Sequence, residues 1–341
     1  MSDDSLPLPL QERLGWPWQA EPIFRESSSL LPKISIVTPC LNSSEFIEEC
    51  LRSVLLQGYP NLEYIVVDGG STDGTIEIVS KYAKFLSCFI SEPDSGQSSA
   101  INKGVLKSSG QLVNWLNADD ILLPGALHAL AQAYEPDPEP VLLSPVRNVD
   151  SERSLVWTTD QSLLLHDVVR FWLGAGHYHQ PGIFVPRALW LRVGGLDEDL
   201  QICMDYELYC KFSPFATFKV IDFTTVEFRR HRDQKTTLNP DLLIVEKSCA
   251  SRRYWRRDKL SPADKSKHDS YIGKEIYKSL VYRKAPLKDC LASFFLLCRE
   301  TKVSLGLVAF FFVVGTLKRL VNKIARAVCA GARIDSSAKY D

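Results

Sequence analysis

The stretch "KISIVTPCLNSSEFIEECLRSVLLQG", residues 33–58, decides the fold because strand periodicity gives way to helix periodicity within it. Residues 33–40 form a short apolar run rich in β-branched side chains, which is typical of a buried parallel strand. Ser43 or Ser44 can cap the helix that follows, and Gly58 ends it. The apolar residues of this helix share one face: Phe46, Cys50, Leu51, Val54 and Leu55.

The same alternation continues along the chain to residue 116. Strands are predicted at residues 62–68, 85–92 and 111–116, and helices at residues 76–82 and 97–108. Alternating strands and helices imply parallel pairing with right-handed crossovers. We therefore predict an α/β fold with a doubly wound, mostly parallel sheet.

The second half of the chain is less regular. The stretches "PVLLSPV" (residues 140–146) and "SLVWTT" (residues 154–159) are predicted to be strands outside the parallel set. A further strand is expected within residues 177–187, and one long strand over residues 218–231. A helix is expected to begin near Asp205, with this residue in its first turn.

The composition is that of an ordinary globular protein. The chain has 341 residues, of which 45% are apolar and 24% charged, so one large or two modest domains are expected. Its nine cysteines are odd in number and include no Cys-x-x-Cys pair, which predicts reduced thiols rather than a disulfide framework or a zinc site. Residues 1–32 are polar and lack the apolar core of a secretory signal. We therefore expect a cytoplasmic protein.

The charges are unevenly distributed. From Arg229 to the end there are 25 Lys and Arg against 11 Asp and Glu, a balance of +14, and the remainder has 15 against 30, a balance of −15. The basic part contains an uncharged apolar stretch, residues 303–317, that is shorter than the roughly 20 residues of a membrane-spanning helix. One explanation is a buried helix packed on the rest of the protein. We favour a helix at the inner face of the plasma membrane, with residues 291–328 making the contact.

Acidic side chains follow three successive predicted strands. Ligands of doubly wound sheets bind beyond the carboxyl ends of the strands. A single aspartate there is better explained as a cap of the next helix, where Asp is favoured. A set that converges on one edge indicates a site instead. The residues expected at this edge are Thr38, Pro39, Asp68, Glu92, Asn117, Asp119 and Asp120.

Several carboxylates at one edge repel each other unless a cation lies among them. Hard oxygen ligands suit Mg²⁺ or Mn²⁺, and such ions commonly serve phosphate-bearing substrates. The chain has no Gly-x-x-x-x-Gly-Lys-[Ser/Thr] loop and no Gly-x-Gly-x-x-Gly turn after its first strand, which disfavours a P-loop nucleotidase and a dinucleotide-binding fold. A nucleotide diphosphate carried on a metal fits the residues better.

Six motifs occur in a specific order: "TPCLN" (38–42), "VVDGGSTDGT" (66–75), "SEPDSGQ" (91–97), "AINKG" (100–104), "WLNADD" (115–120) and "GGLDEDLQICMDYEL" (194–208). On these motifs, the region from Lys33 to His231 resembles the family-2 inverting glycosyltransferases, which have a nucleotide-diphospho-sugar transferase fold of the GT-A type. The resemblance implies a catalytic domain between an N-terminal tail and a basic helical C-terminal extension. The corresponding ranges are 1–32 for the tail, 33–235 for the catalytic domain (33–127 for the nucleotide-sugar half, 128–235 for the acceptor half) and 236–341 for the extension.

The resemblance also implies a role for each matching residue. Asp119 is expected to be the principal ligand, with His231 beside it, of a Mg²⁺ or Mn²⁺ ion that holds the donor diphosphate. Asp205 is expected to be the catalytic base that deprotonates the acceptor hydroxyl. The residues implied in donor binding are Thr38, Pro39, Asp68, Glu92, Asp94, Asn102, Lys103, Asn117 and Arg230.

Four positions depart from the family's pattern: Asn117, Ser99, Cys40 and Met204. Asn117 stands where many members have the first Asp of an Asp-x-Asp motif, and Ser99 stands where Asp is usual. Both changes weaken the expected hold on a metal. Met204 replaces an acid that often precedes the base, which leaves Asp205 with less like-charge repulsion.

Some residues admit two explanations. His177 and His179 would share one strand face, but without a third partner an acceptor-pocket or structural role is favoured over metal binding. Trp115 and Trp172 can stack on sugar, although core packing is the commoner role of Trp. Glu207 can shape the acceptor site or be a solvated helix residue.

The residues and the resemblance together predict a metal-dependent inverting glycosyltransferase. It would move a sugar from a nucleotide-diphospho-sugar to a glycan or lipid-linked acceptor in cell-surface polysaccharide or glycolipid assembly, with no nucleic-acid partner. Three alternatives stay open: a nucleotide-sugar-binding protein of the same fold without turnover, a nicotinamide-binding oxidoreductase, and a membrane-surface scaffold that uses only the tail.

Overall fold

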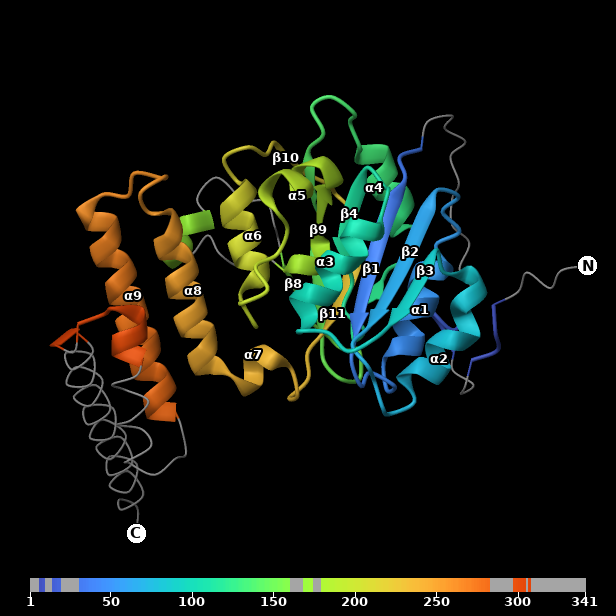
Figure 1. The fold of residues 1–341 in the computed structure, drawn as a ribbon, viewed down its shortest axis with the longest axis horizontal. Helices are drawn as coiled ribbons and strands as arrows, with labels where there is room; N and C mark the ends of the chain where they lie inside the picture. The colour runs from blue at the N-terminus through green and yellow to red at the C-terminus, as the bar shows by residue number, and fades with distance from the viewer. Residues whose placement is uncertain are drawn as a thin grey trace, which may run out of the picture. The chain divides into compact units, whose positions relative to one another are not determined.

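The chain forms two compact units, Met1–Leu238 and Asn239–Asp341. The computed structural model describes residues 6–9, 14–19, 31–159, 168–173, 179–282, 297–304 and 306–307. The first unit contains both sheets, and the described part of the second unit is helical (Figure 1).

A seven-stranded sheet forms the centre of the first unit, with the strand order β10-β6-β9-β4-β1-β2-β3. The strands β4, β1, β2 and β3 pair in parallel, whereas β9 runs antiparallel to both of its neighbours. The predicted doubly wound, mostly parallel α/β sheet is therefore confirmed. The strand bounds are β1 (Ile34–Cys40), β2 (Leu62–Asp68), β3 (Cys88–Ser91), β4 (Leu112–Trp115), β6 (Val141–Leu143), β9 (Ile183–Pro186) and β10 (Phe218–Val220).

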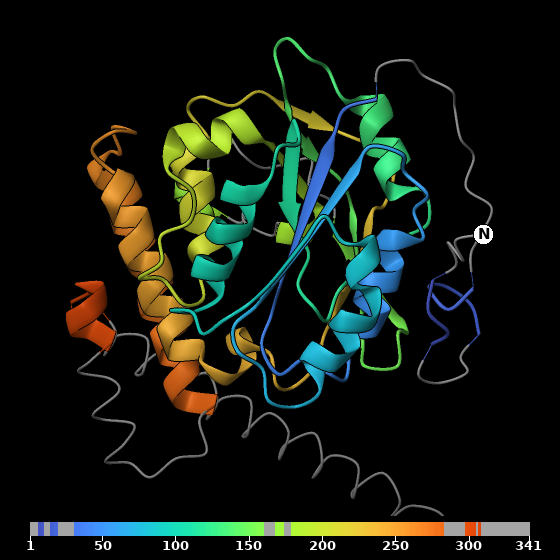
Figure 2. The ribbon, with the colours of Figure 1, turned by 45° about the vertical axis from the view of Figure 1, so that its right-hand side comes forward.

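Helices cover both faces of the parallel strands. Figures 1 and 2 show α1 (Ile47–Leu55) and α2 (Thr75–Tyr82) on one face and α3 (Gln97–Lys107) on the other. This arrangement follows from right-handed crossovers, because the chain moves outward from β1 to β3 and then returns to β4. The helix α3 packs closely on β1, since a Cβ at Gly104 would lie 2.4 Å from Cγ1 of Val37.

A second, four-stranded sheet has the order β5-β11-β7-β8. Its strands are β5 (Ile121–Leu122), β7 (Val146–Val149), β8 (Leu155–Thr159) and β11 (Val226–Arg229). Two predicted single strands are each divided between the sheets: residues 140–146 become β6 and the start of β7, and residues 218–231 become β10 and β11.

Both divisions occur where the chain passes from one sheet to the other. Pro145 has no N–H group with which to continue a ladder, and it separates β6 from β7. The buried hydroxyl groups of Ser144 and Thr225 hydrogen-bond to each other, so the two crossing points lie side by side. The pairing partner therefore changes within each stretch, and local sequence periodicity does not reveal such a change.

The first unit also contains further helical elements. They are η1 (Ala83–Phe85), α4 (Ala126–Ala133), η2 (Val168–Leu173), η3 (Gln180–Gly182), α5 (Arg187–Val193), α6 (Met204–Phe212) and α7 (Lys235–Leu238). Asp205 lies in the first turn of α6, as the sequence predicted.

The second unit contains α8 (Pro240–Tyr254) and α9 (Pro262–Tyr282). Arg252 of α8 forms an ion pair with Asp269 of α9 at 2.5 Å, and the fully buried ring of His268 packs edge-on against Trp255. Among the described residues, none of the helices combines the length and apolar character needed to cross a membrane. Most of the apolar stretch 303–317 and most of its predicted membrane contact, residues 291–328, lie outside the described residues.

Part of the predicted N-terminal tail packs on the sheet-containing unit. The ring of Trp16 is buried, and its Nε1 donates a hydrogen bond to the carbonyl oxygen of Leu122 in β5 at 2.7 Å. The guanidinium of Arg52 in α1 donates to the carbonyl oxygens of Pro7, Pro17 and Trp18. The described residues of this tail thus belong to the same unit as the sheets.

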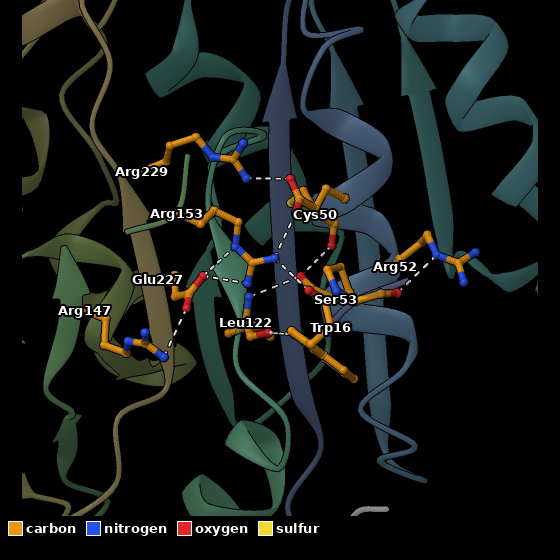
Figure 3. A network of polar contacts seen from close by, with 11 residues as sticks. Trp16, Cys50, Arg52, Ser53, Leu122, Arg147, Arg153, Glu227 and Arg229 are labelled. Atoms are coloured by element: carbon orange, nitrogen blue, oxygen red, sulfur yellow. Dashed lines mark hydrogen bonds and ion pairs between the residues drawn. The ribbon is translucent and has the colours of Figure 1, made fainter. Parts of the chain in front are cut away.

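Buried ion pairs join β11 to α1. Nη2 of Arg229 lies 2.5 Å from Oε2 of Glu49, and Nη1 of Arg153 lies 3.1 Å from Oε1 of the same carboxylate. Arg153 also pairs with Glu227 at 2.7 Å and donates to the carbonyl oxygen of Trp16 at 2.6 Å (Figure 3). One network therefore connects the N-terminal segment, α1, β11 and the turn after β7.

The carboxylate of Glu49 is predicted to be essential for stability. Its side chain is 5% exposed and that of Arg229 is 7% exposed, so Glu49→Gln leaves a buried guanidinium without its carboxylate partner. We expect the free energy of unfolding to fall by about 3 kcal/mol, as measured by urea denaturation. The matched variant Glu77→Gln, at an exposed position of α2, should change it by less than about 0.5 kcal/mol. Equal effects of the two substitutions would contradict the prediction.

Candidate active site

An open pocket of about 920 Å³ lies at the carboxyl edge of the seven-stranded sheet. Its walls come from the segments after β1 and β4, the start of α3, the segment before β9, the start of α6 and the segment after β11. Seven of the residues predicted for the site line it: Pro39, Asp94, Asn117, Asp119, Asp205, Arg230 and His231.

Asp119 and His231 form a pair at the pocket surface. Nε2 of His231 lies 3.0 Å from Oδ2 of Asp119, although the two residues are 112 positions apart in the chain. The hydrogen bond to Asp119 raises the pKa of His231 above its usual value, and partial burial opposes this. The two predicted metal ligands are therefore adjacent. Among the described residues, no group of three or more His, Cys, Asp or Glu side chains is arranged to hold a metal ion.

Asp120 lies beneath this pair and is fully buried. Its Oδ1 accepts a hydrogen bond from the backbone N–H of Arg229 at 3.2 Å, and Nδ2 of Asn117 is 3.5 Å from its Oδ2. Burial raises the pKa of Asp120 well above its usual value, and the negative charge of Asp119 adds to this effect. The adjacent acids thus have different roles: one faces the pocket, and the other fastens β11 to the end of β4.

The amide of Asn117 is already occupied within the protein. Its Oδ1 accepts a hydrogen bond from Nε2 of Gln97 at 2.8 Å, and Oε1 of Gln97 accepts one from Nζ of Lys235 at 3.0 Å. This chain of contacts connects the start of α3, the end of β4 and the segment after β11. Asn117 lines the pocket, but its carbonyl oxygen serves this connection.

Asp68 is fully buried and does not line the pocket. Its carboxylate accepts hydrogen bonds from the backbone N–H groups of Gly70 and Ser71 and from the hydroxyls of Ser71 and Ser91. Burial alone would raise the pKa of Asp68, but these hydrogen bonds outweigh it and lower the pKa. In this arrangement Asp68 holds the turn after β2 and joins it to β3.

Four further residues predicted to bind the donor lie outside the pocket lining. Thr38 hydrogen-bonds to the hydroxyl of Tyr64 at 3.0 Å, and Glu92 forms an ion pair with Lys103 at 2.5 Å. Asn102 hydrogen-bonds to both backbone groups of Leu196 and holds the loop before α6. Their predicted roles in donor binding stay predictions, while their contacts here connect parts of the fold.

The start of α6 brings Asp205 into the pocket beside Met204. One carboxylate oxygen of Asp205 accepts a 2.6 Å hydrogen bond from the backbone N–H of Tyr206.

The residues with two explanations can now be placed. Glu207 is neither solvated nor in the pocket: its side chain is 2% exposed and pairs with Lys211 at 3.0 Å. Trp115 lines the pocket although its side chain is almost fully buried. Trp172 is a buried residue outside the pocket lining, and His177 lies outside the described residues.

The four-stranded sheet supplies a wall that the sequence did not predict. Trp157 of β8 and Phe228 of β11 both line the pocket. The guanidinium of Arg230 lies 4.7 Å from the ring centroid of Trp157, and the ring of His179 lies 4.9 Å from that of Phe228. Phe228 of β11 pairs with Asn148 of β7, and Asn148 pairs with Trp157 of β8. Trp157 and Phe228 therefore lie in one row across the sheet. This non-local pairing was invisible in the sequence.

Asp73 is another pocket residue that sequence reasoning missed. Its carboxylate accepts hydrogen bonds from the backbone N–H groups of Ser44 and Thr75, at 3.0 and 3.1 Å, and from the hydroxyl of Thr75 at 2.6 Å. Partial desolvation opposes ionisation, but these bonds outweigh it and lower the pKa of Asp73 to about 2. The "STDGT" sequence was a usable signal, since Asp two positions before Thr favours such a turn.

Part of the chain matches a known protein family. Residues 35–186 match the family described as Glycosyl transferase family 2. The chain is 28% identical over 211 residues to an uncharacterized glycosyltransferase of Rickettsia prowazekii (strain Madrid E), covering 60% of this chain and 66% of that protein. It is 31% identical over 202 residues to a chondroitin synthase of Escherichia coli, covering 58% of this chain and 29% of that protein. The chain thus spans less than two thirds of either relative.

A similar fold occurs in a solved structure. The crystal structure of S. aureus TarS 1–349 in complex with UDP-GlcNAc superposes with a TM-score of 0.57 at 19% identity, covering 79% of this chain and 81% of that one. At this level of identity, the likeness shows the fold, and it agrees with the GT-A type that the motifs indicated.

The hydrogen bonds of Asp73 predict a pH-dependent contribution to stability. Because its pKa is lowered by folding, the ionised carboxylate stabilises the native state above the unfolded pKa near 3.8, and this contribution is lost as the pH falls through about 2. Asp73→Asn should therefore be less stable than the wild type at pH 7, and the difference should shrink steadily below pH 4. Urea denaturation at several pH values measures it, with the exposed Asp222→Asn as the control. A pH-independent difference would contradict the prediction.

Proposed function

We propose that this chain, which matches glycosyl transferase family 2 over residues 35–186, is a metal-dependent, inverting glycosyltransferase. It transfers a sugar from a nucleotide-diphospho-sugar to a glycan or lipid-linked acceptor in cell-surface polysaccharide or glycolipid assembly. The observation that carries the proposal is the gathering of Asp119, His231 and Asp205 around one pocket from three distant parts of the chain.

The donor is proposed to bind on the side of the pocket formed by β1 and the start of α3. Pro39 and Asp94 line this side, and Gly96 opens α3 there with a hydrogen bond from its N–H to Oδ1 of Asp94 at 2.8 Å. A UDP-sugar is the first donor to test, because the structure of similar fold from S. aureus is a complex with UDP-GlcNAc.

Asp119 and His231 are the residues proposed to hold the metal. A carboxylate oxygen and an imidazole nitrogen 3.0 Å apart can share one divalent ion, and a diphosphate can complete its coordination, as Mg²⁺ and Mn²⁺ sites commonly do. When bound, the ion would supply positive charge to the leaving diphosphate. The side-chain oxygen of Asn117 already accepts a hydrogen bond from Gln97. We therefore assign the metal to Asp119 and His231 and not to Asn117.

Asp205 is proposed to act as the base. It would take the proton of the acceptor hydroxyl while that oxygen bonds to the anomeric carbon and the bond from this carbon to the diphosphate breaks. Attack from the side opposite the leaving group inverts the anomeric centre. The hydrogen bond from the N–H of Tyr206 to one carboxylate oxygen restricts the orientation of this carboxylate.

A protein that binds nucleotide sugars without turnover is the second candidate. The side chain of Asn117 favours this candidate, because it adds no negative charge for a metal and its oxygen already accepts a hydrogen bond from Gln97. Release of UDP from a UDP-sugar by the purified chain would exclude it.

Asp205→Asn is expected to abolish transfer while leaving donor binding intact. The amide cannot accept the proton, so transfer should fall by at least about 100-fold, the lower end of the usual contribution of a general base. Activity is measured as UDP release with a panel of UDP-sugars, Mn²⁺ and oligosaccharide acceptors, and binding as the thermal shift produced by UDP. Asp199→Asn, an exposed neighbour outside the pocket, is the control. Full activity of Asp205→Asn would show that another group is the base.

Asp119→Asn is expected to weaken binding of Mn²⁺ in the presence of UDP. Losing the charged ligand should reduce Mn²⁺ affinity by about tenfold or more, a loss that even outer-shell substitutions commonly produce. Isothermal titration of Mn²⁺ into the chain with saturating UDP measures this without an activity assay. Asp199→Asn, at an exposed position outside the pocket lining, should retain Mn²⁺ affinity. Unchanged affinity in Asp119→Asn would contradict the metal assignment.

A further inference from the structure

We propose that Trp157 and Gln180 form a subsite for a saccharide acceptor on the wall of the pocket built by the four-stranded sheet. The proposal rests on the proposed glycosyltransferase function and adds the chemical class of the acceptor and the residues that recognise it.

The location of this wall follows from the strand order. Along the carboxyl edge, β3, β2 and β1 carry the proposed donor side, β4 carries Asp119, and β9 lies on the opposite side of β4. Because β9 is antiparallel to β4, its first residues lie at the same edge, and His179 and Gln180 immediately precede it. Gln180 and Asp119 therefore line the same pocket, with the proposed donor side beyond Asp119.

Trp157 offers a flat apolar surface at the rim. The side chain lies on β8, at the edge of the described four-stranded sheet, and it is 40% exposed although it lines the pocket. Arg230 contributes a cation over the indole at 4.7 Å, which restricts the orientation of the ring. A half-exposed indole held in place is the kind of surface that binds the apolar C–H face of a sugar ring.

Gln180 supplies a fixed polar group in the same wall. Its side-chain Nε2 donates to Oδ1 of Asn114 and to the carbonyl oxygen of Trp115, both at 2.8 Å. Because both partners are acceptors, the orientation of the amide is determined, and its Oε1 has no hydrogen-bond partner among the described residues. The residue is 7% exposed, and a buried acceptor without a partner is costly. The oxygen is covered in the structure, and an acceptor hydroxyl would satisfy it where binding displaces the neighbouring atoms.

The two features favour a saccharide over an acyl chain or an isoprenoid. An aromatic face with a few oriented polar groups matches a molecule that has one apolar face and hydroxyls along its edge. An entirely apolar acceptor would cover Trp157 but leave Oε1 of Gln180 unsatisfied. We therefore assign the wall to the sugar residue of the acceptor, whether or not a lipid follows it.

A printed array of linear and branched oligosaccharides tests the proposal with the full chain. The wild type should bind a subset of the glycans, and Trp157→Ala should bind the same subset about tenfold more weakly. Trp157→Phe, which keeps a ring, should retain most of the binding, whereas Trp157→Leu, which keeps apolar bulk alone, should not. Val156→Ala is the matched control, because Val156 is 52% exposed on the same strand but lies outside the pocket lining.

A second measurement separates this proposal from the function on which it rests. Slow release of UDP from a UDP-sugar without any acceptor depends on the donor side, so it is measured in the wild type and in the control Val156→Ala, which lies outside the pocket lining. Circular dichroism confirms that the wild type and Trp157→Ala both fold. The acceptor KM of Trp157→Ala should rise by a larger factor than its donor KM. No glycan binding by the wild type, or equal binding by Trp157→Ala, would overturn the subsite. Loss of UDP release in the wild type would overturn the proposed function instead.

Discussion

The ion pair between Arg229 and Glu49 is the constraint on which the arrangement of the pocket depends. Side chains of a strand alternate between faces, so burying Glu227 and Arg229 on the α1 side turns Phe228 and Arg230 toward the pocket. A shift of register by one residue would exchange the two sets and leave charges in an apolar environment. The backbone N–H of Arg229 also holds Asp120, and Gln234 donates to the carbonyl oxygen of Arg229, so the segment that carries His231 is held on both sides.

The same constraint explains how two adjacent acids acquire different properties. Asp120 is fully buried, and its pKa is raised by desolvation and by the charge of its neighbour, so its contribution is to connect β4 to β11. Asp119 remains at the surface of the pocket with a side chain that is 26% exposed. If both carboxylates faced the pocket, their repulsion would have to be offset entirely by a bound cation. Burying one of them lets the pocket keep its shape whether or not a cation is present.

The sequence predicted well what depends on local pattern and poorly what depends on pairing between distant segments. The alternation from β1 to β4 followed from periodicities within short windows, and the positions of Asp119 and Asp205 followed from motif order. The role of Asp68 was less predictable, because the N–H and hydroxyl groups that donate to it lie in a turn and on a neighbouring strand. Residues 140–146 and 218–231 were each predicted as one strand, since nothing local shows that they pass between sheets at Ser144 and Thr225. Trp157 was overlooked for the same reason.

The division into two sheets separates the requirements of stability from those of recognition. The strand β11 cannot change freely, because Glu227 and Arg229 belong to a buried network and removing one partner leaves an uncompensated charge. The strand β8 is joined within the described sheet only to β7, and Leu155, Val156 and Trp157 are all at least 40% exposed. Substitutions on β8 can therefore alter one wall of the pocket while the network beneath β11 keeps Asp119 and His231 together. On the proposed function, the residues that contact the acceptor should therefore vary most among related chains at the edge strand β8, and the residues at the ends of β4 and β11 should vary least.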